Sequence, residues 1–133
     1  LLLSGDHVLM KITPNIGLWQ HSQPNPLGRF MTSLRALRDL DVRLALPGHR
    51  HNIEDWAGRI DELIGHHEAR LEHVLDALAA GRHTPYAIAG FIFPTERFSP
   101  HEWRFAIAET LAHLAYLEQQ AQVAQMDGQF TRT

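Results

Sequence analysis

The sequence contains no cysteine, so it has no disulfide framework, and any bound metal ion must be held by histidine and carboxylate side chains. It has no apolar run near the roughly 20 residues that cross a bilayer. The opening LLLSGD is too short for a secretory signal and has no basic flank. We therefore expect no membrane association and a reducing, cytoplasmic location. Histidine is abundant instead, with ten copies in 133 residues.

Neither half of the chain has a large positive charge. The net charge is −3, and it divides into +1 for residues 1–57 and −4 for residues 58–133. A nucleic-acid-binding module needs a basic face that neutralises phosphates. The acidic second half therefore predicts that this chain does not bind DNA sequence-specifically.

Residues 1–49 have the pattern of a strand, a loop, a helix and a second strand. The apolar run Leu1–Ser4 ends at a Gly-Asp turn signal, as a buried strand does. After a loop rich in Pro, Asn and Gly, Asn25 and Pro26 have the types preferred at the N-cap and first position of a helix, which we expect to end near Asp41. The run VRLALPG then reads as a second strand. Such a crossover makes the two strands parallel.

Two potential metal ligands directly follow these strands. Asp6 comes after the first and His49 after the second, and in parallel sheets ligands bind beyond the carboxyl ends of the strands. A carboxylate and an imidazole suit Zn²⁺, Mn²⁺ or Fe. The same residues also fit an ordinary turn aspartate and an exposed loop histidine, and spacing alone leaves both interpretations open. His7, Asn15 and His51 are candidates for contacts to these ligands or to a substrate.

The rest of the chain has the pattern of three helices and a hairpin. The first helix is expected to begin at an N-cap Asn52, with Asp55 three residues on, and to stop at Gly81. The second begins at Thr84 and Pro85 and is closed by Pro94. The third begins at the capping box of Ser99, Pro100 and Glu102. Asp127-Gly128, between two short strand-like runs, is a type I′ hairpin signal. Three helices followed by a hairpin describe a winged helix.

The histidines of the long predicted helix and the three tryptophans can be explained either by a function or by ordinary packing and solvation. His66 and His73 are seven residues apart and share a helix face, with His67 next to them. They fit either a surface metal site or ordinary solvated and partly buried helix histidines. Three tryptophans, Trp19, Trp56 and Trp103, are most simply explained by core or interdomain packing.

Taken together, these motifs resemble the C-terminal part of a metallo-β-lactamase-fold hydrolase with an appended winged-helix domain. SGDHVL resembles the fourth metal motif of that family and LALPGH the fifth. The same pattern continues through TPNIGLW, NPLGRFMTSLRAL, HHEARLEHVLDAL, TPYAIAGFIF and AETLAHLAYL, over nearly the whole chain. The resemblance implies an α/β remnant, the β-α-β part of the αββα sandwich, at residues 1–57. A mainly α winged-helix domain would follow at residues 58–133.

The resemblance also implies a site and an activity. Asp6 would bridge two zinc ions and His49 would bind one of them, with Gly5 allowing the turn that aims the carboxylate. Metal-activated water would attack a thioester, an ester or lactone, or an RNA phosphodiester. The expected partners are therefore a small-molecule substrate or RNA.

One part of the family pattern is missing. The sequence contains neither the His-x-His-x-Asp-His cluster nor the separate third-motif histidine, and HRHNIED continues with Asn52-Ile53 where Asp-His belongs. We therefore expect a C-terminal fragment of a longer enzyme, inactive by itself, because Asp6 and His49 do not supply the three protein ligands of a catalytic zinc. Surface left uncovered favours a homodimer. The alternative is a non-catalytic winged-helix binding or scaffold protein with a nucleic-acid or protein partner.

Overall fold

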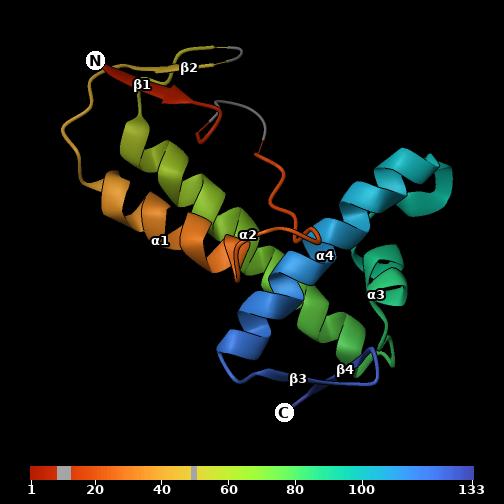
Figure 1. Ribbon diagram of the computed structural model, residues 1–133. Helices are drawn as coiled ribbons and strands as arrows, with labels where there is room; N and C mark the ends of the chain where they lie inside the picture. Colours follow the sequence, from red (N-terminus) through yellow and green to blue (C-terminus); the bar gives the residue numbers. More distant parts are fainter. Residues whose placement is uncertain (9–12, 49–50) are drawn as a thin grey trace. The chain divides into compact units, whose positions relative to one another are not determined.

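The computed structural model describes residues 1–8, 13–48 and 51–133 of a mixed α/β chain (Figure 1). It consists of two compact units. Unit 1 comprises Leu1–Asn15 and Phe30–His67, and unit 2 comprises Ile16–Arg29 and Glu68–Thr133. Neither unit is continuous in sequence, whereas the predicted domains are residues 1–57 and 58–133. That predicted boundary stays a prediction.

The β-α-β crossover expected from the sequence is present, with both strands and most of its helix in unit 1. Strands β1 (Leu2–Gly5) and β2 (Ala45–Pro47) are parallel neighbours, and helix α1 (Pro26–Arg38) lies between them in the chain (Figure 1). The register pairs Leu2 with Ala45 and Gly5 with Pro47. The carboxyl ends of both strands therefore meet at one edge of the sheet.

The start of helix α2 (Trp56–Ala79) corrects one prediction. Asn52 was the expected N-cap, but the Asp55 Oδ1 atom accepts the Gly58 N–H at 3.0 Å, so the cap lies three residues later. The physical reason is tertiary, because Ile53 exchanges backbone hydrogen bonds with Ala45 and this bridge holds the chain extended before the helix. Pairing with the sheet thus delays the helix.

Apolar side chains of α1, α2 and the strands form the core of unit 1. The Trp56 indole N–H donates to the Leu37 carbonyl at 2.8 Å, which ties the first turn of α2 to the end of α1. Each fully buried large apolar side chain stabilises the fold by about 1.5–3 kcal/mol. The buried apolar residues of this unit are Val8, Phe30, Met31, Leu34, Ala45, Ile53, Trp56, Ile60 and Leu63.

A surface ion pair also joins the two helices and provides a pH-dependent test of this packing. Arg38 donates two hydrogen bonds to Asp61, at 2.6 and 2.7 Å, and these bonds hold the pKa of the Asp61 carboxyl below its ordinary value of 3.8. The lowered folded-state pKa means that the pair stabilises unit 1 above the unfolded pKa and loses that effect as the pH falls through the folded one.

We expect Asp61→Asn to lower the denaturation midpoint slightly at neutral pH, because the pair is exposed. The difference in denaturation midpoint between the variant and the parent chain should shrink as the pH drops below 3.8, the ordinary pKa of the aspartate carboxyl. Urea denaturation across this pH range measures it. An equal deficit at all pH values would assign the effect to packing instead of charge.

Unit 2 contains the remaining helices and the hairpin. Helix α3 (Pro85–Ile92), a short 3₁₀ turn (Thr95–Arg97) and helix α4 (Pro100–Gln119) precede the antiparallel strands β3 (Val123–Met126) and β4 (Gln129–Arg132). This element order confirms the one expected from the sequence. Assignment to the winged-helix class stays a prediction.

Local signals in unit 2 act as the sequence predicts. Thr84 accepts the Ala87 N–H at 3.2 Å, and Ser99 accepts the Glu102 N–H at 3.1 Å, so both predicted caps are confirmed. Asp127 and Gly128 have φ values of 52° and 75°, the positive values that a type I′ turn requires. None of the helices in the described part of the chain is both long and apolar enough to span a membrane.

Candidate functional site

A tight turn follows β1 and presents Asp6. Gly5 has φ +54°, in the left-handed region that glycine enters without steric cost. The His7 N–H donates to the Ser4 carbonyl at 3.2 Å, and the Ser4 hydroxyl donates to the Val8 carbonyl at 3.1 Å. These bonds close the turn, and the Asp6 side chain in its middle is exposed.

The turn lies directly against the end of β2. The Gly48 N–H donates to the Gly5 carbonyl at 2.7 Å. A Cβ atom on Gly48 would lie only 2.6 Å from the Asp6 Oδ1 atom, so the carboxylate occupies the space that a side chain at position 48 would need. The structure thus brings Asp6 to the residue that precedes His49. His49 itself lies outside the described residues.

His7 is held by α1. Its Nε2 atom lies 2.9 Å from the Ser33 Oγ atom, and the edge of its ring meets the Phe30 ring with centroids 4.9 Å apart. Partial burial lowers the pKa of the His7 imidazole below its ordinary value of 6.5, so the ring is neutral at neutral pH. His7 therefore anchors the turn that carries Asp6, a contact for which the sequence contains no local signal.

Asn15 and His51 are both exposed. Exposure leaves their side chains accessible to a ligand or a substrate. Their proposed contacts with either stay predictions.

The helix histidines differ from one another in burial. His67 is fully buried in unit 1, where its ring meets the Phe30 ring edge-on at 5.7 Å, and His73 is exposed in unit 2. His67 lies on the apolar stripe of α2, which explains its burial. Burial agrees with the interpretation of His67 as a buried helix histidine, and metal binding by the helix histidines stays a prediction.

The donor chemistry at the strand ends fits a divalent metal ion in part. The exposed carboxylate of Asp6 is a common zinc ligand, and an imidazole follows Gly48 in the sequence. A catalytic zinc takes three protein ligands and keeps a fourth position open. These two residues therefore suit one part of a larger ligand set.

The contact between His7 and Ser33 leads to a prediction for the full-length protein. Given the predicted role of Asp6 as a zinc ligand, Ser33→Ala should weaken zinc binding roughly two- to tenfold, the effect of one lost hydrogen bond, because the turn that carries Asp6 becomes less well held. Competition with a chromogenic chelator measures the zinc affinity. Thr32→Ala, at an exposed position of the same helix, is the matched control.

The amide of His7→Gln can replace Nε2 in the contact with Ser33, so this variant should keep most of the zinc affinity. His7→Ala removes the contact and should bind zinc more weakly. A Ser33→Ala protein that melts earlier but binds zinc normally would assign this contact a purely structural role.

The chain is similar to several known proteins. The family model "Metallo-beta-lactamase-like, C-terminal domain" matches residues 71–132. The Lactamase-like protein adaB of Aspergillus niger is 36% identical over 89 residues, which are 67% of this chain and 26% of that protein. The Lactamase-like protein nscB of Trichophyton rubrum is 41% identical over 56 residues, 42% of this chain and 17% of that protein.

Two solved structures are similar over 98% of the chain. A metallo-beta-lactamase family protein from Thermus thermophilus has 40% identity and a TM-score of 0.86, and a beta-lactamase domain protein from Burkholderia ambifaria has 30% identity and a TM-score of 0.89. The chain spans 41% of each of them and about a quarter of adaB. It is homologous to lactamase-like proteins and contains a metallo-β-lactamase-like C-terminal domain.

Proposed function

We propose that this chain is the C-terminal part of a metal-dependent hydrolase, with Asp6 and His49 among its metal ligands. The observation that carries the proposal is the Asp6 carboxylate at the carboxyl end of β1, packed against the residue that precedes His49. Homology to lactamase-like proteins supports it. Because the chain spans only 41% of the solved relatives, we infer that the remaining ligands come from other parts of the whole protein.

The residues of this chain would hold and orient the metals, with zinc as the proposed metal. Asp6 would hold metal through its exposed carboxylate, a common zinc ligand, together with His49. Gly48 leaves room for this carboxylate, and Ser33 holds the turn through His7. When bound, the metal ions supply Lewis-acid polarisation of the scissile group and lower the pKa of water toward neutrality.

An acyl substrate, either a thioester or an ester or lactone, fits this chain better than RNA. The net charge of −4 over residues 58–133 repels phosphates, whereas a small acyl compound needs no extended basic surface. The helices and hairpin of unit 2, which we assign to a winged-helix class, would then shape the substrate entrance or a subunit interface. A cytoplasmic homodimer is the assembly that we propose for the whole protein.

Chelation of the full-length protein tests this function. We expect hydrolysis of thioester or lactone substrates to be lost after dialysis against a chelator and restored by zinc, because both the attacking water and the scissile group depend on the metal. Rates on acyl substrates and on RNA are measured in parallel. Activity that survives complete metal removal, or hydrolysis of RNA alone, would contradict the proposal.

A further inference from the structure

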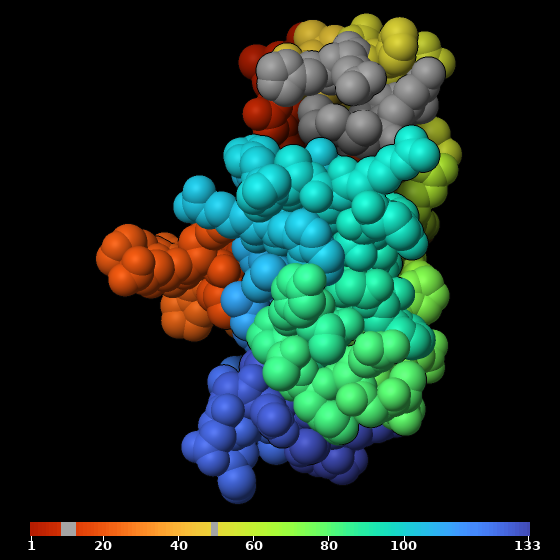
Figure 2. All heavy atoms as spheres, turned by 90° about the vertical axis from the view of Figure 1, so that its right-hand side faces the viewer, coloured from red at the N-terminus to blue at the C-terminus, as the bar shows by residue number. Residues whose placement is uncertain are grey.

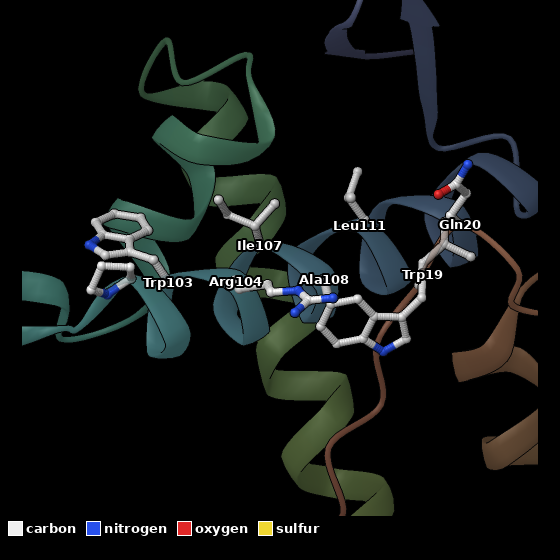
Figure 3. A pocket seen from close by; sticks show the side chains of 9 residues that line it. Trp19, Gln20, Trp103, Arg104, Ile107, Ala108 and Leu111 are labelled. Carbon is white, nitrogen blue, oxygen red and sulfur yellow. The ribbon is translucent and has the colours of Figure 1, made fainter.

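Unit 2 contains a groove that the proposed metal chemistry does not use (Figure 3). It has a volume of about 520 Å³ and lies between the loop Leu18–Gln20 and one face of α4. The α4 residues that line it are Pro100, Trp103, Arg104, Ile107, Ala108 and Leu111. Their spacing places them on a single helix face, so the groove follows the helix for roughly 16 Å. All its lining residues are apolar except Gln20 and Arg104.

The loop Leu18–Gln20, which forms one wall of the groove, is hydrogen-bonded to α4. The Leu18 N–H donates to the Ala108 carbonyl at 2.9 Å. A Cβ atom on Gly17 would lie 3.1 Å from the Ala108 Cβ atom, so the absence of a side chain allows this close approach. In Figure 2 the loop, in orange, stands out from the surface beside α4. The groove is therefore formed before any ligand arrives.

Aromatic contacts hold both tryptophans of the groove. Trp19 donates its backbone N–H to the Ser22 hydroxyl at 2.8 Å, and its ring meets Phe105 edge-on at 5.4 Å. Trp103 stacks on Tyr86 with centroids 4.5 Å apart. Two positioned indole rings at separate points of the lining give an apolar ligand large, rigid contact surfaces.

Arg104 adds one positive charge to this apolar lining. Its guanidinium carbon lies 5.1 Å above the Trp19 ring, and the side chain is exposed (Figure 3). It is the only Lys or Arg residue of α4, and within the described part of the chain it forms no salt bridge. The planar fork of a guanidinium matches a carboxylate, which can accept two parallel hydrogen bonds from it.

We propose that this groove binds an apolar carboxylate, an alkyl or aryl acid, with its body along α4 and its carboxylate on Arg104. The volume falls within the range of about 300–1,000 Å³ that is typical of small-molecule sites, and an apolar lining with few polar groups is typical of them too. The single charge decides the orientation of the ligand. This inference does not depend on the hydrolase activity, because every lining residue belongs to unit 2.

Titration of the 133-residue chain with octanoate tests the proposal. The three indole N–H signals in NMR spectra report the position of binding, because Trp19 and Trp103 line the groove whereas Trp56 is buried in unit 1. We expect saturable shifts of the Trp19 and Trp103 signals and none of the Trp56 signal. Octanol, which has the same chain without the charge, should bind about tenfold more weakly, and octylammonium should not bind.

Charge variants provide the second measurement. Arg104→Gln should weaken octanoate binding about tenfold and leave octanol binding unchanged, whereas Arg97→Gln, at an exposed arginine outside the groove, should change neither. The proposal is overturned by equal losses in both variants, by equal binding of octylammonium, or by no saturable binding. It is overturned as well if the Trp19 and Trp103 signals shift on dilution of the ligand-free chain, as they would if a second copy of the chain covered the groove.

Discussion

Replacement of Asp6 by alanine in the full-length protein is expected to remove at least one metal ion and to lower kcat/KM more than about 100-fold. Loss of a residue that only supports a ligand costs about 10–100-fold, and the loss of a ligand itself costs more. The turn around Asp6 is closed by hydrogen bonds from Ser4 and His7, so the backbone should survive the substitution. Metal content by mass spectrometry and steady-state kinetics on an acyl substrate measure the two effects.

Asp41→Ala provides the matched control, since Asp41 is an exposed aspartate of the same unit. It should retain both the metal content and the activity of the parent protein. An Asp6→Ala protein with full metal content would remove Asp6 from the ligand set. Loss of metal with unchanged activity would instead show that the metal bound at Asp6 is not needed for the reaction.

Gly48→Ala is the second substitution for which a large effect is expected, although it removes no functional group. The new methyl group would lie 2.6 Å from the Asp6 Oδ1 atom, closer than van der Waals contact allows, so the carboxylate must move. We expect zinc affinity to fall about 10–100-fold, comparable to the loss of a residue that orients a ligand. Zinc competition titration of the full-length protein measures this change.

Gly65→Ala separates this steric effect from a general effect of alanine. A Cβ atom on Gly65 meets nothing within 4 Å, and its position inside α2 means that alanine should stabilise the helix by about 0.5–1 kcal/mol. Its zinc affinity should equal that of the parent protein. Unchanged affinity in Gly48→Ala would show that the Asp6 carboxylate binds metal from another position.

The secondary structure of this chain could be predicted largely from local signals. Thr84 and Ser99 cap the helices that they were expected to cap, and Asp127-Gly128 forms the expected turn, because each effect depends on residues no more than four positions apart. The start of α2 could not be predicted in this way. It depends on the pairing of Ile53 with Ala45, and a strand pairing of this kind competes with the cap signal at Asn52.

The candidate site could be predicted only in outline. The β-α-β pattern indicates that the residues after the two strands lie at one edge, and the contact of Asp6 with Gly48 agrees with this. The contact of His7 with Ser33 joins residues 26 positions apart and could not be predicted. Nor could the groove in unit 2, because its two walls are separated by about 80 residues and its tryptophans fit ordinary packing equally well.

The sequence by itself determined the order of the elements, their caps and turns, and the residue types available as metal ligands, because these depend on short-range backbone preferences and on side-chain chemistry. Only the tertiary structure decided which residues support Asp6 and how the loop meets α4. A glycine such as Gly17 or Gly48 shows the reason. Each of these glycines leaves space that atoms of another segment occupy, and the two segments meet only once the chain has folded.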